Sequence, residues 1–120
     1  MNIDESLRFC DLLSKMIKDA GITQAKFYNR LKIKKPYFYD ILSGKTNPPP
    51  PEKQFAIIEI LEPDVNTRNL FFELAAKERN EVPADIARYL QDDNKRTAIR
   101  EKIDYKKMLI DGGNNNGKDN

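Results

Sequence analysis

The chain has 120 residues, enough for one small domain with an appendage, and its 21 Lys and Arg oppose 19 Asp and Glu for a formal net charge of +2. It contains no His and a single cysteine, Cys10, which excludes zinc sites built from His and Cys as well as Ser–His and Cys–His catalytic pairs. One cysteine forms no internal disulfide, and no run approaches the roughly 18 apolar residues of a membrane span. We therefore expect a cytoplasmic protein without enzymatic activity, cofactor, metal or evident small-molecule ligand.

The positive charge is concentrated in one part of the sequence. Residues 1–62 carry ten basic and eight acidic side chains, whereas residues 63–120 carry eleven of each. Within residues 23–45, six basic side chains oppose Asp40 alone, a local net charge of +5. Such a run is commonly only a solvated helix face, so its meaning depends on the elements that carry it.

Three helices are predicted before residue 45. The first covers residues 3–20, where apolar residues recur at spacings of three and four, and Gly21 is a left-handed cap at its end. Thr23 is a good N-cap for a second, short helix that runs through Leu31. The apolar residues of these two helices are Ile3, Leu7, Cys10, Leu13, Ile17, Ala20, Phe27 and Leu31.

The third helix is predicted over residues 36–43, after a tight polar turn. Pro36 suits the first helical position, which places Lys35 at the cap, and Gly44 ends the helix. Its core-facing pair, three residues apart, is Phe38 and Ile41.

Further helical segments follow a linker whose Pro48 to Pro51 favour an extended polyproline conformation. They are predicted at 52–61, 66–79, 83–92 and 95–110. The expected inward-facing residues are Phe55, Ile58, Leu61, Leu70, Phe71, Leu74, Ala75, Ile86, Ala87 and Leu90. The last segment has a thin apolar face and one expected ion pair, Arg100 with Asp104. Since no alternating pattern predicts a strand, the fold class is all-α.

Two short helices joined by a tight turn, the second starting in lysines, form a helix-turn-helix pattern. Such a motif places its second helix in the major groove of DNA, and the start of its first helix suits a phosphate. The motif residues Thr23-Gln24, Ile33-Lys34-Lys35, Phe38, Ile41 and Ser43-Gly44-Lys45-Thr46-Asn47-Pro48 resemble the XRE/Cro-like helix-turn-helix regulators. The resemblance covers residues 7–61, and residues 78–86 are similar to the region after the motif in some longer members.

The resemblance implies a lambda-repressor-like bundle of four to five helices followed by additional C-terminal helices. It assigns residues 1–62 to a DNA-binding domain and residues 63–110 to a helical extension that is a candidate dimerisation element. Residues 111–120, rich in Gly and Asn, are expected to be a disordered tail.

The resemblance also implies which residues read bases. The groove-facing positions fall on Lys35, Pro36 and Asp40, with Tyr37 and Tyr39 alongside. Lys35 has the chemistry to donate to guanine or to a phosphate, and Pro36 to touch a thymine methyl group. Asp40 either accepts from cytosine or pairs with a nearby lysine, and the two tyrosines suit sugar–phosphate, a thymine methyl group or a protein partner.

Phosphate contacts are expected from Thr23, Gln24, Lys34, Lys45 and Asn47, although plain solvation is the alternative for Lys45. The sequence departs from the family at two positions. Tyr28 replaces a small residue where the paired helices touch, so we expect it either to splay them or to turn outward. Lys32 replaces a turn glycine, so we expect a positive φ or a different turn, at a cost of about 1 kcal/mol.

The expected function is therefore sequence-specific binding of double-stranded DNA by a transcriptional regulator of the repressor type. One short helix reads few base pairs, so we expect a homodimer on a pseudo-palindrome with half-sites about 34 Å apart. The alternative is a protein-interaction module on the same scaffold, antitoxin-like or a phage accessory protein, that uses the tyrosines Tyr28, Tyr37 and Tyr39.

Overall fold

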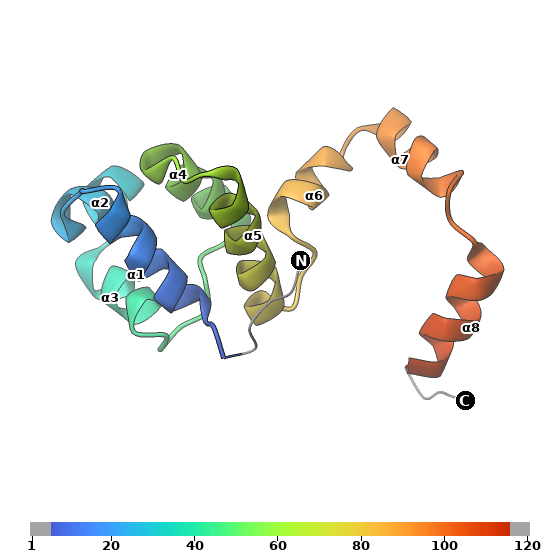
Figure 1. Ribbon diagram of the computed structural model, residues 1–120, viewed down its shortest axis with the longest axis horizontal. Helices are drawn as coiled ribbons and strands as arrows, with labels where there is room; N and C mark the ends of the chain where they lie inside the picture. The colour runs from blue at the N-terminus through green and yellow to red at the C-terminus, as the bar shows by residue number, and fades with distance from the viewer. Residues whose placement is uncertain (1–5, 116–120) are drawn as a thin grey trace. The chain divides into compact units, whose positions relative to one another are not determined.

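The computed structural model describes the backbone of residues 6–115 and the side chains of residues 6–110, and over this range it contains helices, turns and loops but no strand (Figure 1). The all-α class is thereby confirmed. The helices of this range are α1 Phe9–Asp19, α2 Gln24–Leu31, α3 Lys35–Leu42, α4 Pro51–Leu61, α5 Val65–Arg79, α6 Ala84–Tyr89, α7 Asp93–Arg100 and α8 Tyr105–Asn115. None of these helices combines the length and the apolar character needed to cross a bilayer.

The chain divides into two units between Ile86 and Ala87. The first unit extends well beyond residue 62, the boundary expected from the sequence, because α5 belongs to its core. Phe71 on α5 is fully buried, and its ring centroid lies 5.0 Å from that of Phe9 on α1. In this unit α1 packs against α3 and α5, and α2 packs against α3 and α4 (Figure 1).

The first helix begins later than predicted. Residues 1–5, including Ile3, lie outside the described residues, and Arg8 is still extended, with φ −110° and ψ 154°. A carboxylate from α5 supplies the cap, because Glu78 Oε2 accepts a hydrogen bond of 2.7 Å from the Phe9 backbone N–H. At the other end Gly21 has φ +70°, which confirms the predicted left-handed position.

Helix α4 buries a different face from the one predicted. The helix begins at Pro51, one residue earlier than predicted, and Gln54 and Ile57 are buried together with Leu61. Phe55 is half-buried, and its ring is tilted at 47° to that of Phe72 of α5, with ring centroids 5.3 Å apart. Because α4 packs against α2 on one side and offers Phe55 to α5 on another, its apolar residues serve two contact faces, and one stripe at helical spacing does not describe it.

The proline linker is packed on the first unit. Pro48 and Pro49 are buried, and both of their carbonyls accept hydrogen bonds of 2.9 Å. Arg79 Nη1 donates to the Pro48 carbonyl, and Gln54 Nε2 donates to the Pro49 carbonyl. The backbone that follows α3 is therefore fixed from two sides, by α4 and by the end of α5.

The C-terminal helices are shorter and more exposed than predicted. In place of residues 83–92, α6 ends at Tyr89, and the expected inward positions Ile86 and Ala87 are exposed. The segment 95–110 is divided into α7 and α8, since Asp104 accepts from the Lys107 N–H at 3.0 Å and starts a new helix instead of pairing with Arg100. The expected tail is helical through Asn115, and residues 116–120 lie outside the described range.

The left-handed residue that ends α2 provides a stability test. Lys32 has φ 62° and ψ 42°, which costs a residue with a Cβ atom about 1 kcal/mol. We expect Lys32→Gly to raise the free energy of unfolding by about 0.5–1 kcal/mol in urea denaturation followed by circular dichroism. The control Lys26→Gly lies inside α2 and should lower it by about 1 kcal/mol. Equal effects of the two variants would contradict strain at Lys32.

Candidate nucleic-acid interface

Helices α2 and α3 are two short helices joined by a tight turn, as predicted, and they pack against each other. Thr23 caps α2 as expected, because its Oγ1 accepts from the Lys26 backbone N–H at 3.1 Å. Helix α3 starts one residue earlier than predicted: Lys34, extended at φ −79° and ψ 150°, is the N-cap, and Pro36 is the second helical residue. Pro36 is still tolerated there, since the first turn of a helix has no internal partner for its missing N–H.

Tyr28 neither turns fully outward nor separates the two helices. Its ring centroid lies 5.3 Å from that of Phe38 at an angle of 45°, and the side chain is half-buried. Phe38 also lies 5.7 Å from Phe27, so the large side chain is accommodated in an aromatic cluster between α2 and α3. This packing leaves less of Tyr28 available to a partner.

The expected base-reading residues differ in their accessibility. Lys35 and Pro36 are exposed, Tyr39 is 42% exposed, and Tyr37 and Asp40 are half-buried. Within the described part of the chain, no salt bridge involves the Asp40 carboxylate, so the expected alternative of a lysine ion pair is not formed there.

One contact joins the two expected sets of DNA-binding residues. The Tyr39 hydroxyl on α3 donates to Gln24 Oε1 on α2 over 3.0 Å. Because the amide oxygen is occupied, the two N–H groups of Gln24 remain for an external acceptor. Both residues are expected near DNA, but the sequence pattern does not predict this hydrogen bond, since 15 positions separate them.

The expected phosphate residues lie before and after α3. Thr23 and Gln24 start α2, Lys34 caps α3, and Lys45 and Asn47 follow it, and all five are exposed. The Asp40 carbonyl accepts from the backbone N–H groups of Lys45 and Thr46, at 3.0 and 3.2 Å. These bonds fix the path of the chain as it leaves α3.

Two basic residues beside Asn47 were missed. Arg8, which precedes α1, and Lys77, in the last turn of α5, line an open hollow of about 420 Å³ together with Leu7, Asn47 and Glu78. Residues 8, 47 and 77 are far apart in the sequence and belong to no local motif. Neither helical periodicity nor motif spacing predicts that these three residues lie close together.

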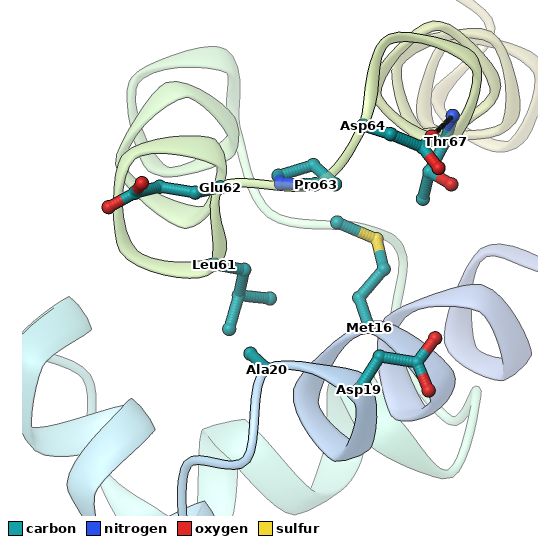
Figure 2. A pocket seen from close by; sticks show the side chains of 8 residues that line it. All are labelled: Met16, Asp19, Ala20, Leu61, Glu62, Pro63, Asp64 and Thr67. Carbon is teal, nitrogen blue, oxygen red and sulfur yellow. Dashed lines mark hydrogen bonds between the residues drawn. The ribbon is translucent and has the colours of Figure 1, made fainter.

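A second hollow, of about 220 Å³, lies between the end of α1 and the α4–α5 junction (Figure 2). Met16 points across it toward Pro63, while the Glu62 carboxylate points away. Asp19 is paired with Lys15 at 2.6 Å, and Asp64 Oδ1 accepts from the Thr67 N–H at 2.8 Å. Since these polar groups are occupied or face outward, the hollow has no convergent set of free donors and acceptors.

The cap at Asp64 predicts a dependence of stability on pH. The Thr67 backbone N–H, and to a lesser extent its side chain, lowers the pKa of Asp64 below its ordinary value. A lowered folded-state pKa means that the charged form stabilises the fold above the unfolded pKa of about 4, and that this contribution is lost as the pH falls through the folded value. We expect the stability difference between wild type and Asp64→Asn to shrink from about pH 5 to about pH 2, measured by urea denaturation.

The matched control is Glu73→Gln, which removes an exposed carboxylate from the same helix α5. Its difference from wild type should change less over this interval. A difference for Asp64→Asn that stays constant down to the lowest pH would contradict the stabilising role of the charged cap.

Comparison of the chain with protein-family models, curated proteins and solved structures finds no match. A function for the protein is therefore inferred from its own residues and their arrangement.

Proposed function

We propose that the protein is a sequence-specific, double-stranded DNA-binding transcriptional regulator that inserts the start of α3 into the major groove, in the manner of the XRE/Cro-like regulators it resembles. The observation that carries the proposal is the contrast between the buried face of α3 and its accessible start. Phe38 and Ile41 are buried in the first unit, whereas Lys34 and Lys35 are exposed and form no salt bridge within the described residues. The accessible start of the helix is thus strongly basic.

The flanking residues suit the two phosphate strands that border a groove. Gln24 presents its amide N–H groups at the start of α2, where the helix dipole also favours an anion. Beyond the other end of α3, the exposed side chains of Lys45 and Asn47 offer further donors to a phosphate. In this arrangement phosphate contacts position the helix, and Lys35 and Pro36 meet base edges.

Useful specificity requires a second copy of the chain. We propose that the protein binds as a homodimer on a pseudo-palindrome with half-sites about 34 Å apart. The exposed apolar side chains of the second unit supply a candidate dimer surface; they include Tyr89, Ile99, Met108, Leu109 and Ile110.

A mobility-shift series with DNA from upstream of the protein's own coding sequence, repeated over a range of salt concentrations, tests the proposal. We expect one or more fragments to be retarded selectively, with an affinity that falls steeply as salt rises, because lysine–phosphate contacts release counterions. Binding that ignores salt, or that never selects a fragment, would contradict it.

The alternative, a protein-interaction module, receives less support. It rests on three tyrosines, of which Tyr28 and Tyr37 are half-buried against the core and only Tyr39 is exposed. Stoichiometric co-purification of a protein partner, without any retardation of DNA, would favour this alternative over DNA binding.

A further inference from the structure

The open hollow beside Asn47 is built from three separate segments of the first unit. Leu7 and Arg8 precede α1, Asn47 lies in the linker, and Lys77 and Glu78 belong to the last turn of α5. It therefore adjoins the linker that leaves α3, and none of its basic residues belongs to the helix-turn-helix motif.

The charged groups of the hollow are arranged to favour an anion. Arg8 Nη2 donates to the Gly44 carbonyl at 3.1 Å, which holds the guanidinium in place and leaves most of its N–H groups available. Lys77 is exposed and forms no salt bridge with another described residue. The acidic group, Glu78, already accepts from the Phe9 N–H at 2.7 Å.

Gly44 allows this placement of Arg8. A Cβ atom at Gly44 would lie 2.5 Å from Nη1 and 2.7 Å from Nη2 of the guanidinium, and the residue has φ +78°. The arginine thus lies directly over the glycine backbone at the end of α3. Arg8 is therefore held beside the end of α3, the helix that we propose to enter the major groove.

The linker itself offers few donors at this point. Pro48, Pro49, Pro50 and Pro51 have no backbone N–H, so no main-chain group between Asn47 and Glu52 is able to donate to a phosphate. An anion beside these prolines has to find its donors elsewhere in the hollow. Arg8, Asn47 and Lys77 are the side chains of the hollow that carry donors.

We propose that this hollow binds a phosphate of the DNA backbone, held by Arg8, Asn47 and Lys77, next to the phosphate contacted by Lys45. The interface then extends from α2 and α3 onto the segment before α1 and the end of α5. This inference rests on the proposed function, because the phosphate belongs to the duplex bound by α3.

Fluorescence anisotropy with a labelled duplex of about 30 base pairs, titrated over a series of salt concentrations, tests it. We expect the double variant Arg8→Gln/Lys77→Gln to bind roughly fivefold to tenfold more weakly at low salt. The slope of log K against log salt should fall by about 1, since one phosphate contact is lost. Lys77→Gln alone should show part of the loss, and because Lys77 has no salt bridge within the described residues, this variant should keep its fold.

The matched control is Lys18→Gln/Arg68→Gln, which removes one exposed lysine from the last turn of α1 and one exposed arginine from the start of α5. Each lies nine or more positions along its helix from the hollow, about 13 Å along the axis. This variant should keep the wild-type slope. Glu78→Gln should instead bind the duplex more tightly, an increase that a loss of folding would not produce.

The outcomes separate this inference from the proposed function. If wild type fails to bind any duplex at any salt, the proposed function fails, and this inference with it. If wild type binds with a steep slope and the double variant matches the control, the hollow makes no phosphate contact while the function stands. A third outcome is that inorganic phosphate alone shifts the amide resonances of Asn47 and Lys77, while the double variant keeps the wild-type salt slope for the duplex. The ligand of the hollow is then a free phosphate, and the proposed contact with DNA is overturned.

Discussion

We expect Phe38→Ala to lower the free energy of unfolding by about 3–5 kcal/mol, which is the usual loss for a buried phenylalanine and a large fraction of the stability of a small domain. Phe38 is fully buried on α3. Its ring lies 5.7 Å from Phe27 and 5.3 Å from Tyr28, both on α2. Removing it leaves a cavity between the two helices of the proposed DNA-binding motif and takes away their shared aromatic contacts. Urea denaturation followed by circular dichroism measures the loss.

The matched control for this variant is Tyr39→Ala, which truncates the neighbouring aromatic residue on the same helix. Tyr39 is 42% exposed, so its removal should cost about 1 kcal/mol. Equal losses for the two variants would contradict the central place of Phe38 in the core. A smaller m-value for Phe38→Ala alone would show that this variant exposes less surface on unfolding, as expected if α3 has already separated from α2 in its folded state.

The parts of the fold that the sequence predicts correctly are those set by local interactions. Thr23 caps α2 through its own hydroxyl three residues away, and Gly21 and Gly44 take positive φ at helix ends. Lys32 adopts the left-handed conformation that the short turn demands. In each case the conformation is set by the residue itself or by a partner within one helical turn of it. The helix ends and turns on either side of α3 are therefore predictable from the sequence.

The parts that it does not predict depend on contacts between distant segments. The cap of α1 comes from Glu78 on α5, and the linker carbonyl of Pro48 is held by Arg79. Tyr39 and Gln24 each fall in the expected site, but their hydrogen bond depends on how α2 and α3 pack. Helical periodicity describes one element at a time, so it gives neither these pairs nor the grouping of residues 8, 47 and 77.

The C-terminal helices show a related limit of the pattern. The sequence predicts one continuous helix over 95–110, yet a break separates α7 from α8. Asp104 ends the continuity because its side chain accepts from the Lys107 N–H and so favours a new helix start over an ion pair with Arg100. With so few apolar residues, packing does not override the local preference of an aspartate for the cap.

We expect Lys35→Ala and Lys45→Ala to affect DNA binding in different ways, although each removes one exposed lysine. Lys35 is the first residue of α3, and in the proposed complex its side chain reaches base edges in the major groove. Its loss should relax the preference at one base pair of each half-site by about 1–3 kcal/mol, between 5-fold and 150-fold. Lys45 follows the helix, so its loss should weaken all sequences alike and reduce the salt slope by about 1.

Binding of both variants to a randomised duplex library, sequenced after selection, measures the two effects together. The expected result for Lys35→Ala is a flattened preference at one symmetric pair of positions, because a lost base contact changes the ratio of affinities and not only their mean. Lys45→Ala should keep the wild-type preference at every position, since phosphates are the same in all sequences. A uniform loss for both variants would assign Lys35 to a phosphate, and base reading by α3 would then have to come from Pro36, Tyr39 or Asp40.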